Sequence, residues 1–343
     1  MKKNTPLNNA ESPKSFEINS KLIRIYPFEN ICIEGGGARI IAIGGTLIEL
    51  EKHGILQKLK RFAGTSAGAI IATALAIGYS GNELSELLCN TDFSQFMDNS
   101  FGIVRDMNRL CTKYGYCTGD NFHRFASEMI AKKTYNIRNG NITFKELYDI
   151  SAKELVLVAT NLSKDKVAYL SRFTTPNMPV SLGVRASMSI PFVYVPVTYD
   201  NDVYCDGGMS MNYALQIFDG DFPKDMDNNY AKINPKTLGL KFMGQDERRN
   251  NDIYMNPDII NNIFSYGGSI LNHMLNRLER IPVKSGYWER SMTIPTGVIG
   301  TLDFKLSKKE KITAQKNAIK VAISELNYFY QNKKFPNDIK IEK

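Results

Sequence analysis

Gly64-Thr65-Ser66-Ala67-Gly68 is the stretch that decides the fold of this 343-residue chain. It has the form G-x-S-x-G and lies between a short apolar stretch, residues 59–63, and a long alanine-rich one, residues 67–79. This order is typical of a serine on a sharp turn between a strand and a helix, with the first helical N–H groups beside its hydroxyl. Ser66 is therefore the candidate nucleophile, and Gly64 and Gly68 would support the turn.

A glycine loop precedes this turn in the chain. Residues 21–32 read as one or two strands and run directly into Glu34-Gly35-Gly36-Gly37-Ala38-Arg39. A helix over residues 40–53 and a strand over residues 59–63 follow. Because strands and helices alternate through the serine turn, we predict an α/β fold with a mostly parallel central sheet flanked by helices.

The rest of the chain is divided by periodicity and turn residues. We predict helices over residues 82–90, 121–132 and 308–331, strands over residues 154–160, 167–171 and 237–242, and a hairpin of residues 193–199 and 203–205. Residues 92–117 read as irregular and rich in aromatic residues and methionine, and helical patterns dominate after residue 258. These elements suggest a flexible arm (1–25), a catalytic domain (26–290) and a basic, largely helical C-terminal extension (291–343).

Composition bounds the function classes. The formal net charge is +8, and residues 300–343 hold ten lysines against five acidic residues. Such a tail can attract anionic lipid headgroups or nucleic acid, or can be only a solvated face. Five dispersed cysteines without C-x-x-C spacing indicate reduced thiols and no zinc site. The N-terminus lacks the apolar centre of a secretory signal, and the apolar run 67–77 is too short to span a bilayer, so we expect a cytoplasmic protein.

The sequence offers several candidates for the residue that would take the proton from Ser66. Only His273 has the chain order of an α/β-hydrolase histidine, and it falls in a helical pattern, as His123 does, while His53 lies beside a helix end. Asp206, in Cys205-Asp206-Gly207-Gly208, ends a short strand, and Gly207 and Gly208 free the turn behind it. Burial would raise its pKa toward that of a useful base, whereas a plain surface turn is the alternative.

The glycine loop is the candidate oxyanion hole. The N–H groups of Gly35, Gly36 and Gly37 can turn into a concave nest, and Arg39 would add a positive charge. A purely structural turn is the alternative. A nucleotide-binding loop is disfavoured, because Ile40 stands where a third glycine is needed and no Gly-Lys-Ser or Gly-Lys-Thr occurs.

Together, Gly35-Gly36-Gly37-Ala38-Arg39, Gly64-Thr65-Ser66-Ala67-Gly68 and Asp206-Gly207-Gly208 resemble the patatin-like phospholipase family in residues and in order. The segments 115–125, 143–147, 158–161 and 185–191 also look like family landmarks. The resemblance implies a three-layer fold in which Ser66 attacks an ester carbonyl and Asp206 accepts the proton. It further implies an oxyanion held by the glycine amides near Arg39, and it implies no cofactor. The substrate would be a phospholipid or lysophospholipid at a membrane surface. Calcium is not expected, since no loop has its ligand spacing.

Two residues depart from the family pattern. Glycine is usual after the arginine, where this chain has Ile40, and an aspartate or small residue is commoner at Glu34. Other functions stay open: a broader esterase, thioesterase or acyltransferase, or a catalytically silent module that binds lipid or a protein partner. Some relatives are injected by bacterial pathogens and need a host activator, so export without a cleaved signal and a protein activator are further possibilities. Nucleic acid binding is not expected.

Overall fold

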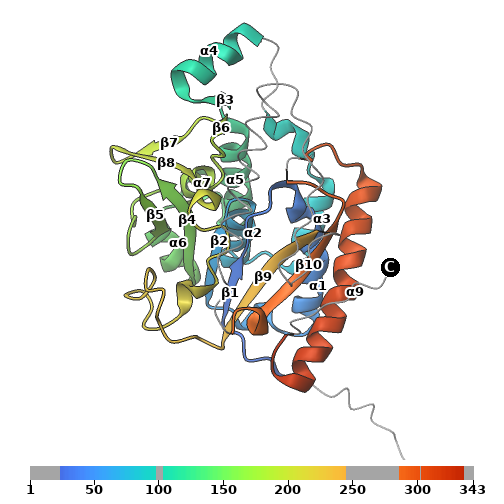
Figure 1. The fold of residues 1–343 in the computed structure, drawn as a ribbon. Coiled ribbons are helices and arrows are strands. Elements are labelled where there is room, and N and C mark those ends of the chain that lie inside the picture. Colours follow the sequence, from blue (N-terminus) through green and yellow to red (C-terminus); the bar gives the residue numbers. More distant parts are fainter. Residues whose placement is uncertain (1–23, 98–102, 245–285, 302, 336–343) are drawn as a thin grey trace, which may run out of the picture.

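A central mixed sheet organises the fold in a computed structural model, which describes residues 24–97, 103–244, 286–301 and 303–335 (Figure 1). The strand order is β10-β9-β1-β2-β4-β8-β7, and β5 also pairs with β4. Their bounds are β1 (Asn30–Ile33), β2 (Arg61–Thr65), β4 (Glu154–Asn161), β5 (Lys166–Ser171), β7 (Val197–Tyr199), β8 (Asp202–Asp206), β9 (Thr237–Gly244) and β10 (Ser291–Gly297). Strands β10, β9, β1, β2 and β4 run parallel, whereas β5 and β8 are antiparallel to β4.

Helices flank this sheet, which confirms the predicted α/β class. They are α1 (Ile43–Lys52), α2 (Ala67–Ala76), α3 (Gly81–Asn90), α4 (Ile103–Lys113), α5 (Asp120–Lys133), α6 (Phe144–Ser151), α7 (Val180–Ser187) and α9 (Lys308–Asn332). Short 3-10 helices include η1 (Gly37–Ala42), η3 (Phe93–Met97), η5 (Gly207–Met209), η6 (Leu215–Phe218) and η7 (Trp288–Arg290). Capping boxes begin α3, α6 and α9, in which a Ser or Thr and a Glu three residues later satisfy each other's backbone N–H groups.

The two faces of the sheet belong to separate hydrophobic clusters, as the alternation along β4 shows. Leu155 and Leu157 point into the larger cluster with the helices, while Val156 and Val158 point into a smaller one. Residues of η6 cover the smaller cluster. Because successive side chains of a strand point to opposite faces, an unbroken apolar run such as β4 is what a sheet covered on both sides requires.

Several element predictions were wrong in detail. Residues 193–199 do not form one hairpin arm: β6 (Phe192–Tyr194) leaves the central sheet and pairs with β3 (Gly115–Cys117), and only β7 pairs with β8. The segment 92–117, predicted as irregular, contains η3, α4 and β3. The predicted helix over residues 40–53 begins as the 3-10 helix η1 and becomes α-helical only at Ile43.

Strand β10 lies in a region where helical patterns dominate the sequence, and it was not predicted. Its buried positions include Ser291, Thr293 and Thr296, so the strand has no strong apolar pattern. The hydroxyls are satisfied internally: Ser291 Oγ lies 2.7 Å from Tyr213 Oη, and Thr293 Oγ1 donates to Glu325 of α9 at 2.5 Å. Polar partners therefore replace the apolar side chains by which a buried strand is usually recognised.

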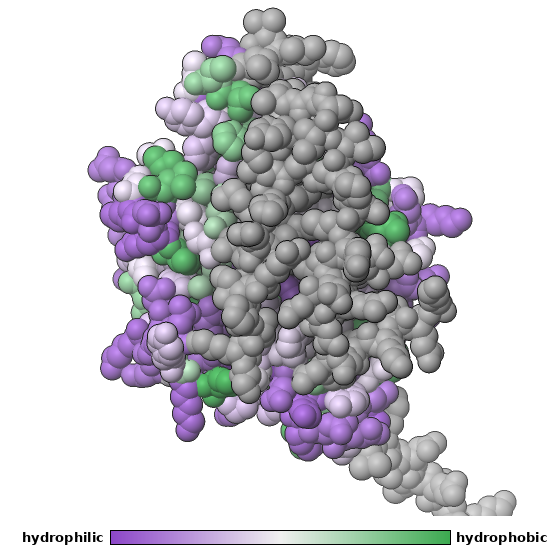
Figure 2. Space-filling model, in the orientation of Figure 1, coloured by the Kyte–Doolittle hydropathy of each residue, from purple (hydrophilic) through white to green (hydrophobic). Residues whose placement is uncertain are grey.

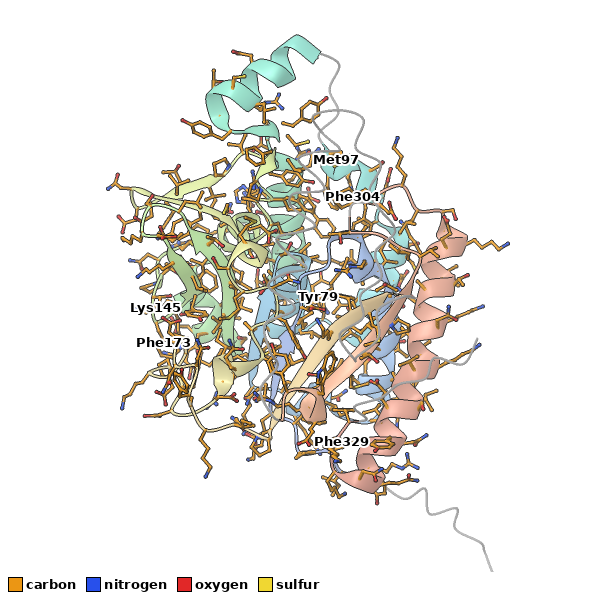
Figure 3. All side chains as sticks on the ribbon, in the orientation of Figure 1. Tyr79, Met97, Lys145, Phe173, Phe304 and Phe329 are labelled. Atoms are coloured by element: carbon orange, nitrogen blue, oxygen red, sulfur yellow. The ribbon has the colours of Figure 1, made fainter. Side chains whose placement is uncertain are left out.

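The segment after residue 290 is part of the central domain where it is described. Strand β10 pairs with β9, and α9 runs beside it along α1 (Figure 1). At the lower end of α9, the ring of Phe329 lies 5.0 Å from that of Phe28 and 6.1 Å from that of Tyr26 (Figure 3). The boundary that we predicted at residue 290 thus falls immediately before a strand of the same sheet. The predicted arm, residues 1–25, lies almost wholly outside the described residues.

An ion pair fastens this segment to the rest of the domain. Arg290 donates to both carboxylate oxygens of Asp219, at 2.6 and 2.7 Å, and both side chains are buried. Arg290→Ala would leave the buried Asp219 carboxylate without its cationic partner, so we expect the free energy of unfolding to fall by roughly 3–5 kcal/mol in urea titrations followed by circular dichroism.

The matched control for this experiment is Lys164→Ala. Lys164 pairs with Asp202 at 2.6 Å, but its own side chain is 57% exposed. Water screens an exposed pair, so Lys164→Ala should lower stability far less than Arg290→Ala does. Equal losses in the two variants would contradict the assigned role of Arg290.

Candidate active site

Ser66 occupies the strand-to-helix turn that its pentapeptide predicts. The residue follows β2, precedes α2 and has φ 51° and ψ −129°, an uncommon backbone conformation for a residue other than glycine. Its neighbours explain the flanking glycines: a Cβ on Gly64 would lie 2.3 Å from Gly68 O, and one on Gly68 would lie 2.5 Å from Ile33 O. Close packing of backbone on backbone therefore holds the strained turn.

Strand β4 brings Asp206 to Ser66. Along β4, Val158 pairs with Thr65 at the end of β2, and the next residue, Ala159, pairs with Asp206 at the end of β8. Strand β5 pairs with residues 156–161 of β4, so β2 and β8 follow one another along its other edge. As a result, Ser66 Oγ donates a hydrogen bond of 2.7 Å to Asp206 Oδ2, although 140 residues separate the two in the chain.

The Asp206 carboxyl group lies in a dry environment. Its residue is 3% exposed, and its second oxygen, Oδ1, accepts the N–H of Gly208 at 2.7 Å. Burial raises the pKa of Asp206 to about 7, although the hydrogen bonds from Ser66 and Gly208 oppose this shift. Gly207 is required for close approach, because a Cβ there would lie 2.2 Å from Val158 O. An aspartate with this pKa can exchange a proton near neutral pH.

The two described histidines have partners elsewhere. His53 Nδ1 lies 2.8 Å from Glu49 O at the end of α1, and His123 Nε2 lies 3.2 Å from Ser181 Oγ. Burial lowers the pKa of His123. His273 lies outside the described residues. Among the described side chains, the group that contacts the Ser66 hydroxyl is thus the Asp206 carboxylate.

The glycine loop lies beside Ser66, but its three amides are not equivalent. A Cβ on Gly35 would lie 3.1 Å from Ser66 Cβ, so this loop and the serine turn are in contact. Gly35 N–H donates to Asn212 O at 3.0 Å and is therefore not available to an oxyanion. The N–H groups of Gly36 and Gly37 meet no acceptor in the described part of the chain. Arg39 lies in η1 and is partly buried, and its role at an oxyanion stays a prediction.

The amide of Ala67 joins these donors. It opens α2 directly after the serine and, like the other first N–H groups of a helix, has no acceptor among the described residues. Sequence reasoning missed this residue, although the general geometry of nucleophile turns, in which the residue after the nucleophile supplies a donor, could have found it.

Both departures from the family pattern have a structural role. The Glu34 carboxylate is buried, forms an ion pair with Lys241, and accepts Phe242 N–H at 2.7 Å, so it ties the glycine loop to β9. Ile40 is fully buried within η1. Side chains also pack on the glycines, since a Cβ on Gly36 would lie 2.6 Å from the Phe242 ring.

A strap over residues 185–189 holds the backbone of both site residues. Ser66 N–H donates to Ser187 Oγ at 2.9 Å, and Ser187 Oγ donates to Val158 O at 2.6 Å. Asp206 N–H donates to Ser189 O at 2.9 Å. The buried guanidinium of Arg185 donates to Ser189 Oγ and to the carbonyls of Thr118 and Val195. The segment was recognised only as a family landmark, because neither serine shows its partner in the sequence.

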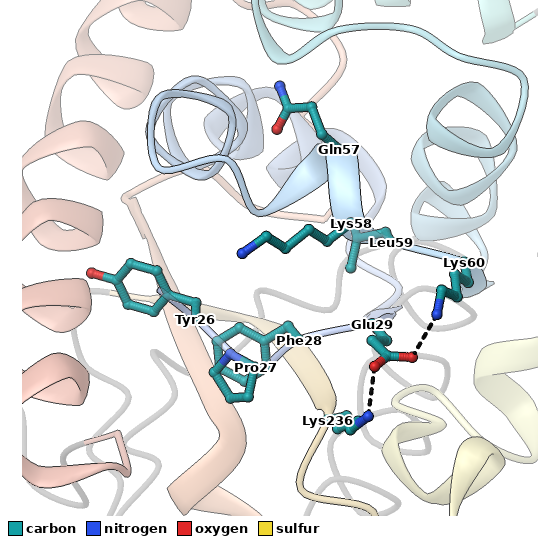
Figure 4. A pocket seen from close by; sticks show the side chains of 9 residues that line it. All are labelled: Tyr26, Pro27, Phe28, Glu29, Gln57, Lys58, Leu59, Lys60 and Lys236. Carbon is teal, nitrogen blue, oxygen red and sulfur yellow. Dashed lines mark hydrogen bonds and ion pairs between the residues drawn. The ribbon is translucent and has the colours of Figure 1, made fainter. Parts of the chain in front are cut away.

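A hollow lies at the amino ends of the parallel strands, away from Ser66. It has a volume of about 480 Å³ and is lined by residues that precede the parallel strands, among them Glu29, Lys60 and Lys236 (Figure 4). Glu29 bridges the two lysines at 2.6 and 3.0 Å, and hydrogen bonds from Lys236 and Lys60 lower its pKa to about 2. Substrates of parallel-sheet enzymes bind at the carboxyl ends of strands, where Ser66 lies.

Neither a metal site nor a membrane span is found within the described ranges. No group of three or more His, Cys, Asp or Glu side chains there could hold a metal ion. The helices described likewise lack the length and apolar character needed to cross a bilayer.

Comparison with known proteins identifies the family. The model of the patatin-like phospholipase family matches residues 31–219. A protein of Acanthamoeba polyphaga mimivirus is 32% identical over 295 residues, which cover 85% of this chain and 91% of that protein. A probable lipid hydrolase of Invertebrate iridescent virus 6 is 28% identical over 209 residues, covering 60% of this chain and 67% of the relative. The fold resembles VipD of Legionella pneumophila, with a TM-score of 0.56, 17% identity and coverage of 89% of this chain and 68% of VipD.

Fold and comparisons define a hydrolase of the α/β class. The chain belongs to the patatin-like phospholipase family.

We predict that the strap supports the site through Ser187. Ser187→Ala would leave the buried Ser66 N–H and Val158 O without their shared partner and so loosen the strained turn. For a soluble ester, we expect kcat to fall about tenfold to a hundredfold with a much smaller change in KM, because the substrate surface itself is untouched. Ser151→Ala removes a hydroxyl bonded only locally, to Leu147 O and Lys153 N–H, and should leave kcat unchanged. Wild-type kcat in Ser187→Ala would refute this role.

Proposed function

We propose that this chain is a serine acyl hydrolase that cleaves fatty-acyl esters of membrane glycerophospholipids or lysophospholipids through Ser66 and Asp206. The observation that carries the proposal is the 2.7 Å hydrogen bond between Ser66 Oγ and the buried carboxylate of Asp206, at the carboxyl ends of the parallel strands. Family membership supports hydrolysis of lipids, and a relative named as a probable lipid hydrolase supports the same substrate class.

In the first step, Ser66 Oγ attacks the ester carbonyl while Asp206 Oδ2 accepts its proton. The carbonyl carbon becomes tetrahedral, and its oxyanion accepts hydrogen bonds from the N–H groups of Gly36, Gly37 and Ala67. The C–O bond to the leaving alcohol then breaks, and Asp206 returns the proton to the alcohol oxygen. An acyl ester on Ser66 remains.

In the second step, water replaces the alcohol. Asp206 takes a proton from the water, whose oxygen attacks the acyl carbonyl through the same donors. The bond to Ser66 Oγ breaks, the serine recovers its proton from Asp206, and the fatty acid leaves. One carboxylate serves as base and acid in both steps, and a pKa of about 7 suits both directions of transfer.

The first test removes each site residue. Ser66→Ala and Asp206→Asn should each lower acyl release by about a thousandfold or more, measured by mass spectrometry of fatty acids released from liposomes and by turnover of p-nitrophenyl esters. A fluorophosphonate probe should label wild type and not Ser66→Ala. Unchanged melting temperatures would show that the folds are intact. Probe labelling at a residue other than Ser66 would refute the proposal. Rapid turnover of soluble esters without hydrolysis of liposomes would instead favour a broader esterase, thioesterase or acyltransferase.

The second test is the pH profile. Asp206 must be deprotonated to act as base, and its pKa is raised to about 7, so kcat/KM for a soluble ester should rise about tenfold per pH unit below pH 7 and level off above it. The raised value has burial as its main cause, and the profile should therefore shift little with salt. A plateau extending down to pH 5 would show that another group serves as base.

Location and regulation belong to the same proposal. We infer that the enzyme works at the cytoplasmic surface of a membrane and uses neither a cofactor nor a nucleic acid partner. If the protein is exported into a host cell without a cleaved signal, it would meet a membrane surface of the same kind there. A requirement for a protein activator predicts that liposome hydrolysis increases when host-cell extract is added, and equal activity with and without extract would exclude it.

A further inference from the structure

Two exposed aromatic side chains lie at the small sheet of β3 and β6. Tyr114 is 68% exposed and Phe192 is 63% exposed. They are neighbours in space, because Phe192 pairs with Gly115, the residue after Tyr114, in the small β3–β6 sheet. A single exposed aromatic residue is ordinary, but Tyr114, directly before β3, and Phe192, the first residue of β6, form an exposed apolar pair within the described part of the chain.

The backbone holds both side chains outward in an unfavourable conformation. Tyr114 has φ 63° and Phe192 has φ 67°, in the left-handed region that bulky side chains rarely adopt. Such strain persists only where surrounding contacts impose it. Here Val195 N–H donates to Cys117 O, and Arg185 binds the Thr118 and Val195 carbonyls, so both strands are anchored close to the two aromatic residues.

The patch is joined to the catalytic machinery by a few residues of chain. Ser187 and Ser189 bind the backbone of Ser66 and Asp206, and the chain reaches Phe192 only three residues after Ser189. Figure 1 shows β3, β6 and α4 above the upper end of the central sheet.

Basic side chains flank the aromatic pair. Lys113, immediately before Tyr114, is exposed at the end of α4, and Arg109 lies one turn earlier, where it donates to Tyr116 O at 2.5 Å. Asp120 and Arg124 follow β3 at the start of α5, both exposed, and their charges cancel. Figure 2 shows hydrophobic surface among polar residues at the top of the molecule, around α4 and β3.

We propose that Tyr114 and Phe192, with Lys113 and Arg109 beside them, form a docking rim that inserts into the surface of an anionic phospholipid bilayer. The proposal rests on the proposed function, because a substrate held in a bilayer must reach the carboxyl end of the sheet. Aromatic side chains prefer the boundary between headgroups and acyl chains, and neighbouring cations bind anionic headgroups. A rim at this position would bring Ser66 to the bilayer.

Binding can be tested without turnover in Ser66→Ala protein. Its affinity for vesicles of phosphatidylcholine with phosphatidylserine is measured by flotation, alone and combined with Tyr114→Ser and Phe192→Ser. Removing both rings should weaken vesicle binding at least tenfold, even at high salt, because the free energy of burying the two apolar rings in the bilayer is lost. Lys113→Ala should weaken binding a few-fold, only with phosphatidylserine and only at low salt.

Tyr135→Ser is the matched control. Tyr135 is also aromatic, 97% exposed and at positive φ, 51°, but it follows the C-terminal end of α5, which leads away from the rim. It should bind vesicles as the parent does. In protein that retains Ser66, the rim variants should lose vesicle hydrolysis in proportion to binding and keep soluble-ester turnover within about twofold.

The outcomes separate this proposal from the proposed function. Vesicle binding that survives loss of both rings, or absence of vesicle binding in the parent, would overturn the rim. A concentration-dependent dimer in light scattering that the double variant abolishes would also overturn it, since a second copy would then cover the patch. Loss of fluorophosphonate labelling and of soluble-ester turnover in wild type would instead refute the proposed function, whatever the vesicles show.

Discussion

One edge of strand β4 is the constraint on which the site depends. Strand β2 ends opposite Val158 and β8 ends opposite Ala159, so a parallel neighbour and an antiparallel neighbour meet head-on along the same edge. Because the two strand ends lie opposite adjacent residues of β4, the residues that follow them, Ser66 and Gly207, must pack closely against each other. Gly207 fits because it lacks a side chain, and the Ser66 turn fits because Gly64 and Gly68 allow backbone to approach backbone. The hydrogen bond between Ser66 and Asp206 is therefore set by strand register.

Burial raises the pKa of the Asp206 carboxyl group and makes its charged form costly to fold around. A raised pKa means that folding disfavours the charged form of Asp206. The structure limits this cost with two donors, Ser66 Oγ and Gly208 N–H, and with the strap that fixes the backbone on both sides. A histidine between serine and acid would need an additional cavity on this edge. Direct contact between hydroxyl and carboxylate, at 2.7 Å, leaves none among the described residues.

The sequence was informative where chemistry is local. The serine turn, the glycine loop and the aspartate turn each depend on glycines at fixed spacing, and the mostly parallel sheet was predicted from the alternation of strands and helices through the serine turn. It was uninformative where partners are distant. Strand β10 has buried serine and threonine whose partners come from Tyr213 and from α9, and Ser187 finds Ser66 only through the fold. The pairing of β6 with β3 could not be read either, because three-residue strands carry too little pattern.

The C-terminal segment shows why a motif scan cannot define the oxyanion site alone. Gly37 was attributed to the freedom of its own backbone, and it does have φ 51°. Yet a Cβ there would also lie 2.0 Å from Thr301 O, which accepts the neighbouring Ala38 N–H at 2.8 Å. Thr301, in the loop between β10 and α9, thus lies against the end of the glycine loop and accepts the Ala38 N–H, while the Gly36 and Gly37 N–H groups have no acceptor among the described residues. A segment outside the matched family region, residues 31–219, therefore shapes the donors on which the proposed chemistry depends.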